Sequence, residues 1–167
     1  DAIAELGDQA PAVYGVNTGF GALAEKRISE GNILALQVNL VRSHASGVGP
    51  DLGDAAVRAM MLLRAQVVAL GYSGVRAEVI DALLGMLNAG VLPRIPAQGS
   101  VGASGDLAPL AHMTAVMIGE GQALVGGKIV PGRDALAAAN LAPITLGPKE
   151  GLALINGTQF STAYAIS

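Results

Sequence analysis

The sequence predicts a mainly α-helical protein with small β-hairpin elements. Apolar residues recur at helical spacing in several stretches, and glycines or prolines separate those stretches. Only one segment has a hairpin pattern, around Gly126 and Gly127. Hydrophobic residues make up 51% of the chain and charged residues 14%, against about 25% charged residues in a typical domain. So apolar a chain is expected to pack against other chains or against more of its own chain.

Three amphipathic helices are predicted in the first half of the chain, after an irregular glycine-rich loop at residues 12–22. Their expected ranges are 30–44, 51–70 and 73–89. The expected caps are Ser29, then Asp51 or Asp54, then Ser73. Gly71 and Gly90 are expected to end the second and third helices, because glycine favours the left-handed conformation found there.

The second half is predicted to begin with an extended segment over residues 91–105. Asp106 is the expected N-cap of a helix that runs to Gly119. The remaining predicted elements are a hairpin over 123–130 and helices over 133–139, 148–156 and 158–167. We find no linker and expect one region, residues 1–167, that forms part of a longer polypeptide.

Composition also bears on function. Ten Lys and Arg residues against 13 Asp and Glu residues give a net charge of −3, and aromatic residues make up 3%. These values argue against a nucleic-acid or membrane-surface partner. No apolar run approaches the roughly 20 residues that span a bilayer. Cysteine is absent, which excludes disulfides and thiolate metal sites and suits a reducing, cytoplasmic setting.

The loop at residues 99–106 is the most unusual stretch, and its residues allow two kinds of chemistry. A glycine-rich loop before a helix can bind an anion, but Asp106 would place a negative charge where a phosphate would sit. The alternative is covalent. In a strained Ala103-Ser104-Gly105 turn, the Gly105 amide nitrogen can attack the Ala103 carbonyl carbon with loss of water. Loss of the Ser104 hydroxyl then leaves an exocyclic methylene.

The product would be 4-methylideneimidazol-5-one (MIO), an electrophile that needs no external cofactor and no metal. Each residue type suits this reaction. Glycine has no Cβ and lets its nitrogen approach closely, alanine crowds the attacked carbonyl little, and serine supplies the leaving hydroxyl.

The sequence GSVGASGDLAPLAH (99–112) resembles the signature of the aromatic amino acid ammonia-lyase family. Further matching blocks are VYGVNTGFG (13–21), SHASGVG (43–49), GYSGVRAEVIDAL (71–83) and KEGLALINGTQ (149–159). The resemblance covers essentially all 167 residues. It implies the N-terminal, MIO-bearing part of a long helical chain whose tetramer builds composite sites from several subunits. The C-terminal helical region would be absent, so this piece alone is expected to be inactive.

The resemblance also implies roles for individual residues. Tyr14 would be the base or proton carrier for the substrate's β-hydrogen, on a loop mobile enough to act as a lid. His44 would read the substrate side chain, and Asn156 would hydrogen-bond the MIO ring or the substrate amine. Taken alone, each has a simpler explanation: a loop tyrosine, a cation at a helix C-terminus and a turn residue.

Other polar residues are expected to be structural. His112 has no assigned role, and Asp106 either caps its helix or assists ring formation. The arginines Arg42, Arg64, Arg76 and Arg94 are expected to form ion pairs or to lie at the surface.

Within the family, Ser43-His44-Ala45 and the LINGT block most resemble the branch that acts on histidine. The expected reaction is elimination of ammonia from L-histidine, a small amino-acid substrate, to give trans-urocanate. The same chemistry on tyrosine or phenylalanine, an aminomutase, and a non-catalytic assembly protein on the same scaffold are the alternatives.

Overall fold

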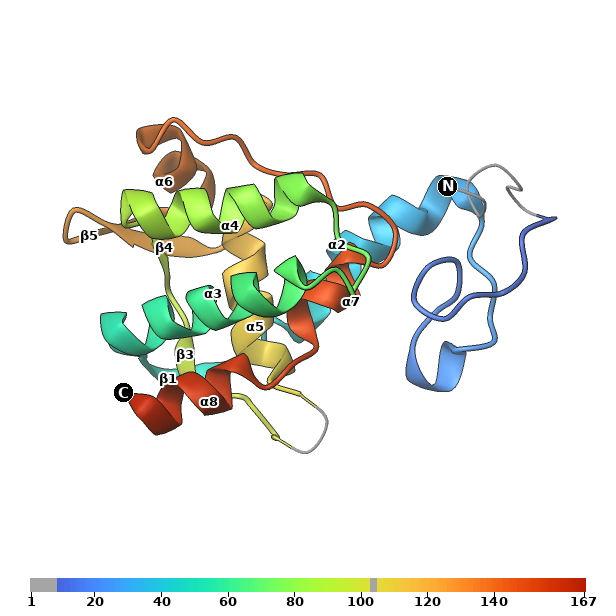
Figure 1. Cartoon of the computed structure of the whole chain (residues 1–167), viewed down its shortest axis with the longest axis horizontal. Helices are drawn as coiled ribbons and strands as arrows, with labels where there is room; N and C mark the ends of the chain where they lie inside the picture. The colour runs from blue at the N-terminus through green and yellow to red at the C-terminus, as the bar shows by residue number, and fades with distance from the viewer. Residues whose placement is uncertain (1–8, 103–104) are drawn as a thin grey trace.

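The computed structural model describes residues 9–102 and 105–167 and is largely helical, with a few short strands (Figure 1). Its α-helices are α2 (Ile33–His44), α3 (Asp54–Ala69), α4 (Ala77–Ala89), α5 (Leu107–Met117), α6 (Gly132–Ala138), α7 (Glu150–Ile155) and α8 (Gln159–Ile166). Short 3-10 helices cover Gly21–Leu23 and Glu30–Asn32. Helix α3 packs against α4 and α8, while α5 packs against α2 and α7. The predicted mainly α class is therefore confirmed.

The β structure consists of two small antiparallel sheets. Strand β1 (Val48–Asp51) pairs with β3 (Pro96–Gln98), and β4 (Gln122–Val125) pairs with both β2 (Leu92–Pro93) and β5 (Lys128–Pro131). The β4–β5 hairpin turns through two glycines with positive φ, as predicted. Strand β1 was not predicted, because its glycine and proline read as helix terminators. A two-stranded ribbon tolerates proline since both its strands are edges.

Helix α5 lies at the centre of the hydrophobic core. Most of its residues are buried, and Leu110 and Met113 are fully inaccessible to solvent. Burial on nearly all sides explains why this helix has no polar face. Because α5 begins directly after the 99–106 loop, the core fixes the position at which that loop ends.

The helix ends differ from the prediction in an instructive way. Gly71 and Gly90 end their helices with positive φ, as expected. The side-chain caps predicted for the second and third helices are wrong: Asp54 is the first residue of α3, Asp51 lies in β1, and Ser73 precedes the start of α4. Asp106 does occupy the N-cap position of α5, but its carboxylate makes no capping hydrogen bond to that helix. Among the described helices, none is long and apolar enough to cross a membrane.

Candidate active site

The end of the 99–106 loop is pressed against the turn between α7 and α8. Gly105 is buried and has a φ of +138°, a conformation that side chains rarely permit. A Cβ at this position would lie 2.7 Å from Asn156 Oδ1 and 3.1 Å from the Gly157 nitrogen. Gly105 and Asn156, two residues that the sequence analysis expects at the site, therefore lie in contact. Ala103 and Ser104 lie outside the described residues.

Asp106, the last residue of the 99–106 loop, also fixes the position of this loop. Its carboxylate is fully buried and accepts hydrogen bonds from the Ser100 hydroxyl at 2.6 Å and from the Ser161 hydroxyl and backbone nitrogen at 2.6 and 2.8 Å. Its own backbone nitrogen donates to the Gly157 carbonyl at 2.7 Å. Ser100 and Ser161 were not predicted as site residues. Through the Asp106 carboxylate, Ser100 closes the start of the loop onto its end and Ser161 joins that end to α8, a role that sequence spacing alone does not reveal.

Asn156 is held by an arginine as well as by its helix. It follows the last residue of α7, and its carbonyl oxygen accepts a hydrogen bond from Arg64 Nη2 at 3.1 Å. Arg64 Nη1 donates to Gln159 Oε1 at 2.8 Å. Burial lowers the pKa of Arg64 to about 10, so the guanidinium stays protonated at neutral pH.

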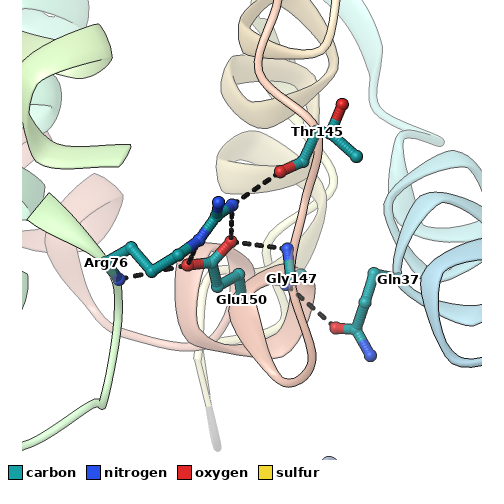
Figure 2. A network of polar contacts seen from close by, with 6 residues as sticks. Gln37, Arg76, Thr145, Gly147 and Glu150 are labelled. Atoms are coloured by element: carbon teal, nitrogen blue, oxygen red, sulfur yellow. Dashed lines mark hydrogen bonds and ion pairs between the residues drawn. The ribbon is translucent and has the colours of Figure 1, made fainter. Parts of the chain in front are cut away.

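The start of α7 is anchored by a second polar network (Figure 2). The buried Glu150 carboxylate accepts from the Arg76 backbone nitrogen and guanidinium and from the Gly147 backbone nitrogen. Gln37 Oε1 of α2 accepts from the Gly151 nitrogen at 3.0 Å. Burial alone would raise the pKa of Glu150, but the hydrogen bonds from Arg76 and Gly147 outweigh it and hold that pKa below its usual value.

Tyr14 lies on a loop that is tied to itself and to α7. Its side chain is 51% exposed, and its ring meets that of Phe20 edge-on. Asn17 Oδ1 accepts from the Val13 nitrogen at 2.7 Å, and the buried Thr18 accepts from the Gly15 nitrogen at 3.2 Å. A Cβ on Gly15 would lie 2.9 Å from Leu152 Cδ2, so the loop packs closely on α7 one turn before Asn156.

His44 is the last residue of α2, and its hydrogen bonding identifies its tautomer. Nδ1 lies 2.9 Å from the Leu40 carbonyl oxygen. A carbonyl oxygen can only accept, so Nδ1 carries the proton in this contact and Nε2 of the neutral ring is an acceptor. His112 has the opposite arrangement: its Nε2 accepts the Gly47 N–H at 3.0 Å and joins α5 to the segment after His44. Burial lowers the pKa of His112, opposed by the nearby Asp51 carboxylate.

The four arginines named in the sequence analysis separate into two kinds. Arg42, Arg76 and Arg94 pair with Glu120, Glu150 and Asp51, respectively, as expected. Arg64 does not fit that expectation, because its side chain is buried and its acceptors among the described residues are uncharged. The reason is that α3, which carries Arg64, packs directly against α8.

The described residues therefore place Gly105, Asp106 and Asn156 together, with the Tyr14 loop packed on the same helix α7. Within residues 9–102 and 105–167, neither Tyr14 nor His44 hydrogen-bonds to Gly105 or Asn156. Both lie on segments that pack against α7: the Tyr14 loop directly, and His44 through α2. An amide side chain beside a buried glycine with positive φ suits the binding of a small polar molecule.

Comparison with known proteins identifies the scaffold, since the aromatic amino acid lyase family matches residues 1–167. The chain belongs to this family. It is 69% identical, over 98% of its length, to a protein from Sorangium cellulosum named histidine ammonia-lyase. It spans 32% of that relative, so it corresponds to about a third of such proteins.

Solved structures confirm the fold. The histidine ammonia-lyase of Trypanosoma cruzi superimposes with a TM-score of 0.86 at 42% identity, over 97% of this chain and 31% of that one. A tyrosine aminomutase from Streptomyces globisporus gives 0.88 at 42% identity, over 97% and 30%. These two neighbours are equally identical to the chain although their names give different activities.

Proposed function

We propose that this chain is the N-terminal, prosthetic-group-bearing region of an enzyme that eliminates ammonia from L-histidine to give trans-urocanate. The contact of Gly105 with Asn156 carries the proposal, because it joins the predicted ring-forming tripeptide to a predicted polar site residue. The 69% identity to a protein named histidine ammonia-lyase supports the choice of substrate.

The described residues fit an MIO group formed from Ala103-Ser104-Gly105. Gly105 has the positive φ and the missing Cβ that a tightly bent cyclised backbone needs, and Asp106 and Asn156 hold it from two sides. When present, MIO supplies an electrophile that makes the substrate amine a better leaving group. No metal is needed for this step.

The chain's own residues would bind the substrate and move its protons. Tyr14 would take the β-proton, which is barely acidic and needs a positioned base. His44 Nε2 would accept a hydrogen bond from the substrate imidazole N–H, since its Nδ1 proton is engaged with Leu40. The Asn156 amide would donate to charge that develops on the ring or hold the substrate amine.

We also propose a homotetramer in a cytoplasmic setting, with sites completed by the remaining two thirds of the chain. Large apolar side chains exposed on the described surface support such an assembly. They include Leu62, Leu70, Tyr72, Tyr164 and Ile166. The absence of cysteine suits a reducing compartment.

The first test is the intact mass of the full-length protein, with Ser104→Ala as the variant. Cyclisation removes two waters, so the wild type should weigh about 36 Da less than its sequence predicts. Ser104→Ala should abolish the near-ultraviolet absorbance of the ring and nearly all ammonia release. Full activity in Ser104→Ala would contradict the covalent mechanism.

A second test separates substrate choice from chemistry by comparing kcat/KM for histidine, tyrosine and phenylalanine. His44→Phe should change the ratio between substrates by roughly tenfold to a hundredfold, because a polar contact to one side chain is lost. Tyr14→Phe should lower kcat/KM by roughly a hundredfold or more on every substrate. An equal loss on all three substrates in His44→Phe would assign that residue to the chemistry or to the fold. A wild type that prefers tyrosine would overturn the substrate.

A further inference from the structure

Arg64 is a buried cation whose partners among the described residues are neutral. Its side chain is 2% exposed, and its Nε has no hydrogen-bond partner within those residues. A buried charge is unfavourable unless it is paired or well hydrogen-bonded. The two hydrogen bonds that Arg64 makes therefore indicate which part of the structure it stabilises.

Both bonds end on the turn between α7 and α8. Nη2 donates to the Asn156 carbonyl and Nη1 to Gln159 Oε1, on either side of Gly157. A Cβ on Gly157 would lie 2.3 Å from Arg64 Nη1 and 2.2 Å from Gln159 Oε1. The guanidinium thus lies directly against this turn, in space that only a glycine leaves open.

The other side of the same turn faces the ring-forming loop. The Gly157 carbonyl accepts from the Asp106 nitrogen at 2.7 Å, and the Gly157 nitrogen lies 3.1 Å from the position of a Cβ on Gly105. A single backbone layer, Asn156-Gly157, therefore separates Arg64 from Gly105.

We propose that Arg64 is a positioning residue: its guanidinium holds the Asn156-Gly157 turn against Gly105, so that the tripeptide cyclises and the Asn156 amide stays in place. This inference rests on the proposed function. The planar fork matters because two donors in fixed geometry span the Asn156 and Gln159 acceptors. A single ammonium at the end of a lysine cannot reproduce that pair of directions.

The test uses the full-length protein with Arg64→Met and Arg64→Lys, and Arg58→Met as the matched control on the exposed face of the same helix. In Arg64→Met, uncyclised protein, about 36 Da heavier, should be a major species in the intact mass. The cyclised fraction should lose roughly a hundredfold in kcat with a smaller change in KM, as expected when a catalytic group is misplaced. Arg64→Lys should fall between Arg64→Met and the wild type, and Arg58→Met should match the wild type.

The intact mass separates positioning from a merely structural role. Circular dichroism first shows which variants fold; if Arg64→Met does not, Arg64→Lys takes its place with the same readouts, since it retains the charge. Folded Arg64 variants that are fully cyclised, with kcat within twofold of the wild type, would overturn the positioning role and leave the proposed function intact. A wild type that lacks the mass deficit would overturn the proposed function, and the role of Arg64 would fall with it.

Discussion

The two ends of α7 are each held by an arginine, but in opposite electrostatic ways. At the start of the helix, Arg76 pairs with the buried Glu150, so that the charge is neutralised where it is buried. Beyond its end, Arg64 binds a backbone carbonyl and an amide oxygen. The first arrangement anchors a helix to the scaffold, and the second fixes a turn that carries a proposed site residue, Asn156. Charge pairing here accompanies stability, whereas a buried cation with neutral partners among the described residues accompanies the proposed site.

The glycines at the two ends show the same division. A Cβ on Gly151 would lie 2.9 Å from the backbone carbonyl oxygen of Gln37, an atom that can move only with α2. A Cβ on Gly157 would instead meet the far ends of the Arg64 and Gln159 side chains. Those ends can rotate away, but only by giving up their hydrogen bonds.

The largest expected effect therefore comes from Gly157→Ala, with Gly151→Ala as its counterpart. Gly157→Ala should fold and lose roughly a hundredfold in kcat, because Arg64 is displaced from the turn and the site residues shift. Gly151→Ala should instead lower the free energy of unfolding by about 1–3 kcal/mol, the usual effect of overpacking. Chemical denaturation and steady-state kinetics on the full-length variants measure both quantities. Equal stability losses with unchanged kcat in both would remove the distinction between the two ends.

The next effect concerns the paired end, where Glu150→Gln keeps the shape but removes the charge. We expect a loss of about 2 kcal/mol at neutral pH, since hydrogen bonds to a charged group are replaced by neutral ones. The value is modest because Arg76 is half-exposed and water screens its charge. The pKa of Glu150 is lowered in the folded state, so its stabilisation is complete above the unfolded pKa of about 4.3 and is lost as the pH falls further.

The measurement is the free energy of unfolding against pH for wild type and variant. The two curves should be parallel near neutrality and converge below about pH 4.3. Arg58→Gln, on the exposed face of α3, is the control and should follow the wild type. A constant gap down to pH 3 would show that Glu150 acts through packing and not through its charge.

The sequence was sufficient to predict the helices and most of their ends, but not the long-range hydrogen bonds that anchor those ends. Helical spacing and terminal glycines are local signals, so α2 to α8 were located to within a few residues. The N–H of Arg76 at the start of α4 is accepted by Glu150, 74 residues later, and the Asp106 carboxylate binds Ser161, 55 residues away. No local cap rule contains such partners, and the predicted cap at Ser73 was wrong for that reason.

The site shows the same limit. Gly105 was selected by the chemistry of the Ala103-Ser104-Gly105 turn and Asn156 by the family resemblance, and the structure places the two residues in contact. Arg64 was expected to pair with an acid or to lie at the surface, because a sequence shows which residues are charged but not which are enclosed. Arg64 is enclosed because α3 packs against α8, and the sequence does not show which helices are neighbours. Gly157, in the Asn156-Gly157-Thr158 turn, is a local hint of a close approach.

The smallest expected effect concerns the uncharged hydrogen bond that joins α5 to the segment after His44. The His112 Nε2 accepts the Gly47 N–H at 3.0 Å, so a proton on that nitrogen would abolish the bond. Burial lowers the pKa of His112 in the folded state. The unfolded chain therefore binds more protons, and the stabilisation by this hydrogen bond is complete above the unfolded pKa of about 6.5 and declines below it. This sign matches that of Glu150, but the decline begins about two pH units higher.

His112→Gln retains an acceptor that does not titrate, so the variant should lose less stability than the wild type between pH 7 and 5. The difference should not exceed about 1 kcal/mol, the net contribution of one neutral hydrogen bond. Identical slopes for wild type and variant in that window would show that His112 takes up its proton equally in the folded and unfolded states, and would contradict a lowered folded pKa.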